Sequence, residues 1–242
     1  MIPRLADNLA QVRARIARAA ARAGRAPDAV RLVAVTKSVD TPTAAALAGL
    51  GVGELGESRV QVLERRRAEW HAAAPQPRWH FLGHLQRNKA RAAVRAADEI
   101  HSLDSARLCD ALAEAARAEG RRPAVWIELD LVGAAERTGL PRAELAPLVE
   151  RAARTRELEL QGLMALAPEP QQDGRDAARA REVFDELARI ARALDPAPFA
   201  GARVRLSMGM SSDFEAAIEA GSDLVRIGTA LFAGLAPAGG AA

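Results

Sequence analysis

The chain of 242 residues has no tyrosine, one cysteine and few aromatic residues. Aromatics make up 3% of the sequence and hydrophobic residues 49%, so the core must be built from Ala, Leu, Val and Ile. Because Cys109 is the single cysteine, an intramolecular disulfide is excluded and a cytoplasmic location is expected. Cys109 lies within a helical pattern, away from any histidine, which is typical of an inert buried thiol.

Long apolar runs are also missing. No stretch approaches the roughly 18 apolar residues of a membrane-spanning helix, and the N-terminus lacks the apolar segment of a signal peptide. We therefore expect no membrane partner. The sequence pI is about 9.9, but the formal net charge is only +3 because 34 basic residues face 31 acidic ones. The chain is therefore not expected to bind nucleic acid.

Lysine is scarce, since it occurs only at Lys37 and Lys89 although Lys and Arg together number 34. Lys37 ends the apolar run of residues 31–37, which alternates like a buried strand. An arginine cannot form a Schiff base or act as an amine nucleophile, whereas a lysine can. Lys37 is therefore a candidate for amine chemistry, with its stem desolvated at the strand end. The alternative is a surface cation without a chemical role.

Apolar residues recur at three- and four-residue spacing near the N-terminus, which predicts an amphipathic helix over residues 1–24. We interpret its arginine-rich face as the solvated side of a covering helix rather than as a binding surface. Further along, eight short strands alternate with helices. The predicted strands are residues 31–37, 51–56, 79–83, 99–103, 125–131, 158–166, 204–208 and 224–228. The predicted helices are residues 41–50, 58–71, 88–97, 105–119, 141–154, 173–194 and 212–220, with a short closing helix.

This alternation predicts parallel βαβ units of an α/β fold. Eight units at this length favour a single (β/α)8 TIM barrel with an extra N-terminal helix over an open doubly wound sheet. We expect one domain over residues 1–242, ending in a mobile tail at 236–242. Functional residues of such barrels gather at the carboxyl ends of the strands. Because the eighth strand neighbours the first, Lys37 and Arg226 should approach each other.

Small residues follow the last two strands. Residues 206–213 read LSMGMSSD, and residues 226–229 read RIGT; each segment leads from a strand towards an expected helix start. Barrels commonly bind phosphate at these two places through backbone N–H groups. The alternative is simple helix capping by Ser211 or Ser212.

A lysine, a phosphate cup and an arginine together suggest pyridoxal 5′-phosphate (PLP) as cofactor. Its aldehyde would condense with Lys37, and its phosphate would lie at Ser211, Gly228 and Thr229. Arg226 could face the pyridine nitrogen. Because an arginine cannot accept the ring proton, the cofactor would be a weak electron sink.

Two other motifs are set aside. Residues 51–56 match GxGxxG, but a helix precedes the motif and the motif itself has a strand pattern, unlike a dinucleotide-binding turn. His80 and His84 have a metal-ligand spacing, yet Gly83 lies between them at a strand end. No acidic or cysteine cluster completes a site around them, so no metal is expected.

The chain resembles the pyridoxal phosphate homeostasis protein family over nearly its whole length. The matching stretches are LVAVTK (32–37), GESRVQ (56–61), WHFLGHLQRNK (79–89), IHSLDS (100–105), GLM (162–164) and LSMGMSSDFEAAIEAGSDLVRIGTALF (206–232). The resemblance implies a barrel like the N-terminal domain of alanine racemase, with PLP held as a Schiff base on Lys37. It implies further cofactor contacts at Ser207, Ser211, Arg226, Gly228 and Thr229, and Ser58 is an additional candidate contact. Ser58 stands where the family commonly has Asn, and Leu55 where it has Phe.

The resemblance implies a carrier or buffer of PLP that supports vitamin B6 and amino-acid homeostasis. A monomer is expected, with PLP-dependent apoenzymes as candidate partners. A racemase needs a second base, typically a tyrosine from an additional β-domain, and this chain has no tyrosine. We therefore expect no catalytic residues. Two alternatives stay open: a PLP-dependent amino-acid racemase of low activity that uses Lys37 alone, and a phosphosugar-metabolising barrel with Lys37 as its Schiff-base lysine. The latter gives Arg226 no role.

Overall fold

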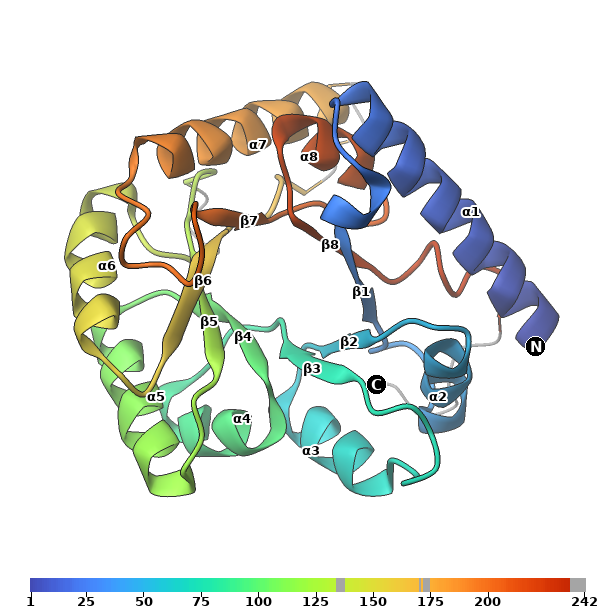
Figure 1. The fold of residues 1–242 in the computed structure, drawn as a ribbon, viewed down its shortest axis with the longest axis horizontal. Coiled ribbons are helices and arrows are strands. Elements are labelled where there is room, and N and C mark those ends of the chain that lie inside the picture. Colours follow the sequence, from blue (N-terminus) through green and yellow to red (C-terminus); the bar gives the residue numbers. More distant parts are fainter. Residues whose placement is uncertain (134–137, 170, 172–174, 236–242) are drawn as a thin grey trace.

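A computed structural model describes residues 1–133, 138–169, 171 and 175–235. Its eight parallel strands close into a barrel in chain order, with β8 paired to β1, and helices surround the barrel (Figure 1). The strands are β1 (Arg31–Val35), β2 (Glu54–Glu57), β3 (Arg78–Phe81), β4 (Glu99–Leu103), β5 (Ala124–Glu128), β6 (Glu159–Met164), β7 (Arg205–Ser207) and β8 (Leu224–Ile227). The predicted (β/α)8 barrel is therefore confirmed.

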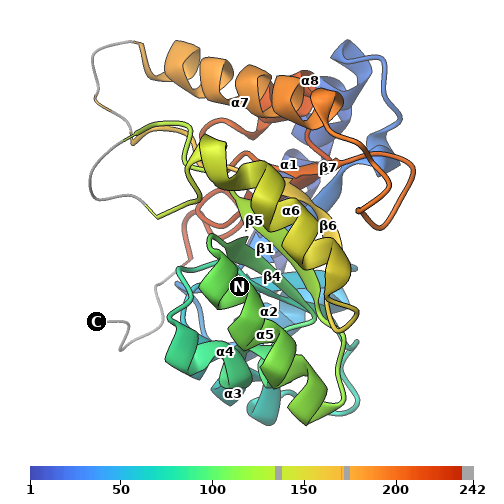
Figure 2. The same cartoon turned by 90° about the vertical axis from the view of Figure 1, so that its left-hand side faces the viewer.

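The helices form the outer layer, and Figure 2 shows α5, α6 and α7 outside the strands. The α-helices are α1 (Ile2–Arg22), α2 (Thr41–Gly49), α3 (Val60–Glu69), α4 (Ala90–Ala96), α5 (Ala106–Glu119), α6 (Leu145–Arg154), α7 (Asp176–Ala193) and α8 (Phe214–Ala220). The 3₁₀ helices are η1 (Pro27–Ala29), η2 (Arg87–Lys89) and η3 (Arg142–Glu144). None of the described helices is both long enough and apolar enough to cross a membrane.

Helix α5 shows how local sequence sets these elements. The Ser105 hydroxyl accepts a hydrogen bond from the Leu108 amide at 3.3 Å and caps the first turn. The helix ends at Gly120, whose φ of +60° suits glycine. Leu108 and Leu112 are buried beneath it. The predicted helix over residues 105–119 is therefore confirmed.

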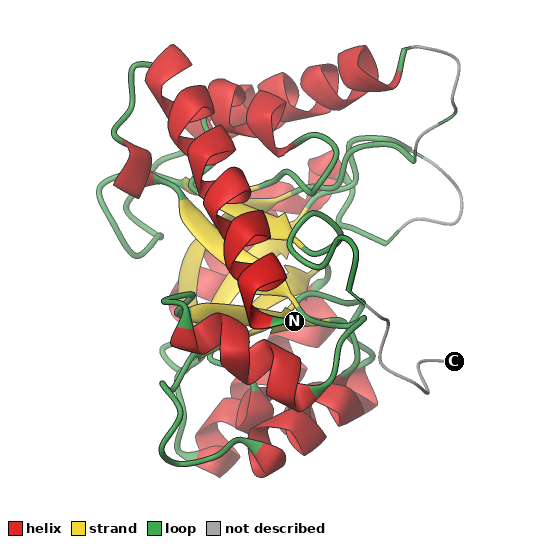
Figure 3. Cartoon of the chain, turned by 90° about the vertical axis from the view of Figure 1, so that its right-hand side faces the viewer, coloured by secondary structure: helices red, strands yellow, loops and turns green. Residues whose placement is uncertain are grey.

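Helix α1 lies outside the strands of the barrel (Figure 3), and its apolar residues Leu5, Leu9, Val12 and Ile16 are buried. On its polar side, Arg15 makes an ion pair with Glu215 of α8 at 2.8 Å, and its guanidinium lies 4.5 Å from the centre of the Phe214 ring. Arg22 pairs with Glu219 at 2.6 Å. Several arginines of this helix are therefore used within the protein, as expected for a covering helix.

The interior of the barrel has an apolar and a polar part. Val33, Trp126, Met164 and Leu224 form a small buried cluster, separate from the larger core. Charged residues begin six of the strands instead, and those that begin β1 to β4 are joined by ion pairs: Arg31, Glu54, Arg78 and Glu99. Arg31 bridges the Glu54 and Glu99 carboxylates at 2.7 and 2.5 Å. We call these four residues the barrel floor, because they lie at the amino end of the strands.

Four expectations about local structure are wrong or concern residues outside the described ranges. Strand β1 ends at Val35 rather than at Lys37, because the ladder to β2 stops at the bond from the Thr36 amide to the Gly56 carbonyl. The expected closing helix is wrong for the described residues, where Leu231 and Phe232 bond back to Gly228 in a turn. The predicted tail at 236–242 and the predicted start of a helix at Asp173 lie outside the described residues.

Candidate functional site

Arg226 lies on β8 with its side chain buried in the barrel. One guanidinium nitrogen donates to Ser207 Oγ at 2.6 Å, and another donates to the Ala165 carbonyl at 3.1 Å. No carboxylate of a described residue lies within 4 Å of the Arg226 guanidinium, the distance that defines an ion pair. Burial lowers the pKa of Arg226 to about 10, although the more distant charges of Glu128 and Asp213 oppose this shift. The site therefore contains a buried cation that no ion pair between described residues neutralises.

Ser211 stands over the turn that follows β8. Its Oγ accepts hydrogen bonds from the amides of Gly228 and Ala230, both at 3.3 Å. Two backbone N–H groups therefore converge on one point, as in sites that hold an anion oxygen. Gly228 packs against β1, where a Cβ on it would lie 3.1 Å from the Val35 carbonyl oxygen. The structure thus brings Ser211 and Gly228 together as predicted, and Thr229 is exposed beside them.

The loop after β7 is shaped by Gly209, whose φ is +95° and whose Cβ would lie 2.6 Å from the Ala217 Cβ. Asp213 accepts a hydrogen bond from the Met210 amide at 2.6 Å. Helix α8 begins at Phe214, with Asp213 rather than Ser211 or Ser212 at its N-cap position. The alternative of helix capping by Ser211 or Ser212 is therefore wrong, and the Ser211 hydroxyl accepts from the Gly228 and Ala230 amides instead.

Lys37 lies two residues beyond β1 in a turn, and its side chain is exposed. The expected desolvated stem is therefore wrong. Within the described ranges, no hydrogen bond or ion pair involves its amine. Ser58, after β2, is half-buried, and its carbonyl packs so closely on Gly83 that a Cβ there would lie 2.0 Å away. The two positions thus lie beyond neighbouring strands at the carboxyl end of the barrel.

The turn that carries Lys37 is held by a buried arginine that sequence reasoning missed. Arg66 of α3 donates to the carbonyls of Asp40, Thr36 and Val39 at 2.9, 3.3 and 2.8 Å. Its Nε lies 3.0 Å from Glu57, which also accepts a hydrogen bond from the Thr36 hydroxyl at 2.5 Å. Burial raises the pKa of Glu57 against these contacts. Arg66 therefore holds the backbone on both sides of Lys37.

Two hollows lie along the rim after β2, β3 and β4. The smaller, of about 190 Å³, is lined by Ser58, Arg59 and Lys89 among others. The larger, of about 840 Å³, is lined by residues 84–88, 104, 105, 107 and 108, which include Arg87 and Arg107. His84 lines both hollows. The rim beside Ser58 is therefore open and lined by basic residues.

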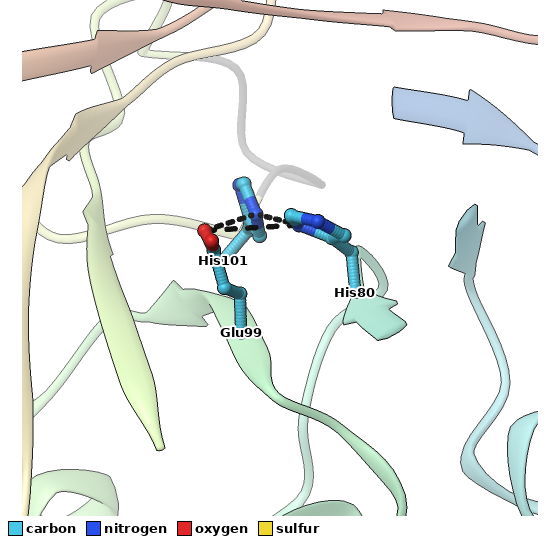
Figure 4. A group of neighbouring side chains, drawn as sticks. All are labelled: His80, Glu99 and His101. Carbon is cyan, nitrogen blue, oxygen red and sulfur yellow. Dashed lines mark hydrogen bonds and ion pairs between the residues drawn. The ribbon is translucent and has the colours of Figure 1, made fainter. Parts of the chain in front are cut away.

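A buried trio of His80, Glu99 and His101 lies inside the barrel (Figure 4), where their possible ligand atoms are within 4.8 Å of one another. The expectation that no acidic residue accompanies His80 is therefore wrong. However, Glu99 already accepts hydrogen bonds from Arg31, Arg78 and Trp126 at 2.5, 2.6 and 2.7 Å. Two guanidinium groups on this carboxylate oppose the binding of a divalent cation.

The trio left a signal in the sequence. Glu99 and His101 are two residues apart on one strand, so they share a face, and β3, which contains His80, pairs with β4.

The other two motifs have no part in this trio. His84 is exposed and lies 3.5 Å from Asp104. The glycine motif is also structural, because a Cβ on Gly56 would lie 2.5 Å from the Leu82 side chain.

The fold places this chain among barrels of the alanine racemase type. Residues 8–236 match the protein family described as alanine racemase, N-terminal domain. The structure is similar to alanine racemase from Corynebacterium glutamicum, with a TM-score of 0.67 and 17% identity, over 97% of this chain and 64% of that one. At this identity the likeness concerns the fold alone.

Closer relatives narrow the class. The chain is 36% identical over 235 residues to the pyridoxal phosphate homeostasis protein of Escherichia coli (strain K12), covering 94% of this chain and 95% of the relative. It is 41% identical over 224 residues to that of Deinococcus radiodurans, covering 92% and 98%. The structure of PipY from Synechococcus elongatus with PLP bound has a TM-score of 0.80 and 32% identity, over 94% of this chain and 99% of PipY. The chain therefore belongs to the pyridoxal phosphate homeostasis protein family.

Proposed function

We propose that this protein binds PLP at the carboxyl end of its barrel and carries or buffers it for vitamin B6 and amino-acid homeostasis. The observation that carries the proposal is the buried Arg226 guanidinium without an ion-pair partner among the described residues. A buried charge is costly unless polar groups satisfy it. A ligand with an acceptor atom facing Arg226 would complete its hydrogen bonding, and PipY, a relative of nearly equal length, holds PLP.

The residues around Arg226 suit the parts of PLP. The exposed amine of Lys37 is available for a Schiff base with the aldehyde. The converging amides of Gly228 and Ala230, with Ser211 and Thr229, would hold the phosphate. Arg226, supported by Ser207, would donate to the pyridine nitrogen. Ser58, which follows the neighbouring strand β2, would contact the cofactor as well. When bound, PLP supplies an electrophilic carbonyl and an electron-withdrawing ring.

A carrier is favoured over a racemase because the chain supplies no tyrosine as a second base. The Arg226 guanidinium would also donate to the ring nitrogen without protonating it, so little electron density would be drawn into the ring. Lys37 would bind and release PLP at an exposed position beside the open rim. This arrangement suits delivery to PLP-dependent apoenzymes by a cytoplasmic monomer.

Absorption spectroscopy of the purified chain with added PLP tests the proposal. We expect a visible Schiff-base band in the wild type and in Lys89→Ala, which keeps the amine at position 37. The band should be lost in Lys37→Ala. A colourless wild type that retains no PLP would contradict the proposal. Steady multiple turnovers of alanine racemisation, lost in Lys37→Ala, would instead support the racemase alternative.

A further inference from the structure

A line of polar contacts crosses the barrel interior from Arg226 to the barrel floor. Ser207 Oγ, which accepts from Arg226, lies 3.0 Å from His101 Nδ1. His101 Nε2 lies 3.0 Å from His80 Nδ1. His80 Nε2 lies 3.1 Å from a carboxylate oxygen of Glu54, in a bent contact, and meets no other acceptor. Ser207, His80 and His101 are fully buried, so water does not compete with these contacts.

The Glu54 end of this line sets the proton positions, because the Ser207 hydroxyl could accept from both Arg226 and His101. A guanidinium can only donate, and an ionised carboxylate can only accept. His80 therefore carries its proton on Nε2, facing Glu54, and its Nδ1 accepts from Nε2–H of His101. Nδ1 of His101 is then an acceptor, so the Ser207 hydroxyl donates to it. This assignment leaves Ser207 Oγ free to accept from Arg226, and both imidazoles are neutral.

We propose that His101, aligned by His80, is a positioning residue that holds Arg226 in place through the Ser207 hydroxyl. By accepting the Ser207 proton, His101 turns the hydroxyl so that its lone pairs face the Arg226 guanidinium. If His101 were protonated, its Nδ1–H would compete for those lone pairs and the hydroxyl proton would have to find another acceptor. The neutral ring therefore makes Ser207 a better acceptor for the buried cation.

The surroundings of His101 support a neutral, fixed ring. Its plane stacks on Trp126 at 5.2 Å between ring centroids and 14° between planes. Burial lowers the pKa of His101 well below its usual range, and the charges of Arg226 and Arg31 act in the same direction. Glu99 faces the ring at 3.8 Å and opposes this shift. The Glu99 carboxylate is, however, already held by Arg31, Arg78 and Trp126.

Nitrogen-15 NMR of histidine-labelled protein without PLP tests the proton positions directly. The chain has four histidines, and exposed His71 and His84 can be assigned with His71→Gln and His84→Gln. We expect His80 and His101 to show the neutral Nε2–H form at neutral pH. A proton on Nδ1 of His101, or a doubly protonated His101, would overturn the proposal even if PLP binds as proposed above.

PLP binding, which rests on the proposed function, gives the second readout. His101→Asn places an amide oxygen close to the position of Nδ1 and should bind PLP within about threefold of the wild type. His101→Leu keeps the volume but removes the acceptor, and should bind PLP about tenfold more weakly with an altered visible band. A folded His101→Leu protein with wild-type affinity and spectrum would contradict the proposal. If His101→Leu does not fold, the NMR measurement on the wild type still tests the role of His101. A wild type that binds no PLP would count against the proposed function and leave the NMR result as the test of His101.

Discussion

Replacing Glu99 by glutamine should destabilise the barrel markedly while preserving its shape. Glu99 receives hydrogen bonds from Arg31, Arg78 and Trp126, all between 2.5 and 2.7 Å, and its side chain is only 2% exposed. A glutamine offers one acceptor oxygen and turns an N–H group towards at least one of these donors. Breaking a buried ion pair from one side costs about 3–5 kcal/mol.

Two features reduce this cost. Arg31 keeps both of its hydrogen bonds to Glu54, and the Arg78 side chain is 46% exposed, so water can replace part of its lost contact. We therefore expect a loss of about 2–4 kcal/mol in the free energy of unfolding. For a chain of this size each kcal/mol shifts the melting temperature by roughly 2–4 °C, which gives a decrease of roughly 5–15 °C.

Thermal and urea unfolding followed by circular dichroism measures the effect. Glu64→Gln is a matched control, because Glu64 faces Arg95 at 3.5 Å with its side chain 38% exposed. The control should melt close to the wild type, as is usual for surface pairs. If Glu99→Gln had the same melting temperature as Glu64→Gln, the Glu99 carboxylate would not hold the barrel floor together.

Two further changes should follow from the same structure. Burial alone would raise the pKa of Glu99, but the charge and hydrogen bond of Arg31 hold this pKa well below its usual value of 4.5; the pKa of Glu54 is lowered too. These carboxylates therefore stabilise the fold above about pH 4.5 and lose that effect as the pH falls, so acid unfolding should be less steep in Glu99→Gln than in the wild type. Gly209→Ala should cost about 2–4 kcal/mol, since it adds a left-handed alanine to a Cβ contact of 2.6 Å; Gly120→Ala, with open space around its Cβ, should cost only about 1 kcal/mol, and equal losses would contradict the steric argument.

The barrel could be predicted from sequence because the pattern that marks each strand and helix lies within that segment. Each strand is a short apolar run followed by a helix pattern, and eight such units leave few alternatives. Because the carboxyl ends of the strands share one face, Ser207, Ser211, Arg226 and Gly228 could also be expected to meet, although they come from two strands and the loops that follow them.

The features that the sequence did not predict depend on contacts between residues that are distant in the chain. The alternation of residues 31–37 continues beyond the point where β2 can pair with it, so the position of Lys37 in a turn could not be read from its own segment. The clamp that Arg66 forms on this turn requires α3 to lie against it. The buried trio of His80, Glu99 and His101 could have been predicted, however, since Glu99 and His101 occupy one face of a predicted strand.

The central claim is that PLP is held on Lys37, and covalent mapping tests it most directly. The PLP-loaded protein is reduced with borohydride, digested, and analysed by mass spectrometry. With only Lys37 and Lys89 as lysines, the assignment has few alternatives. We predict one reduced PLP adduct per chain, on the peptide that contains Lys37 and absent from Lys37→Ala. An adduct on Lys89 or on the N-terminal amine, with Lys37 unmodified, would contradict the account.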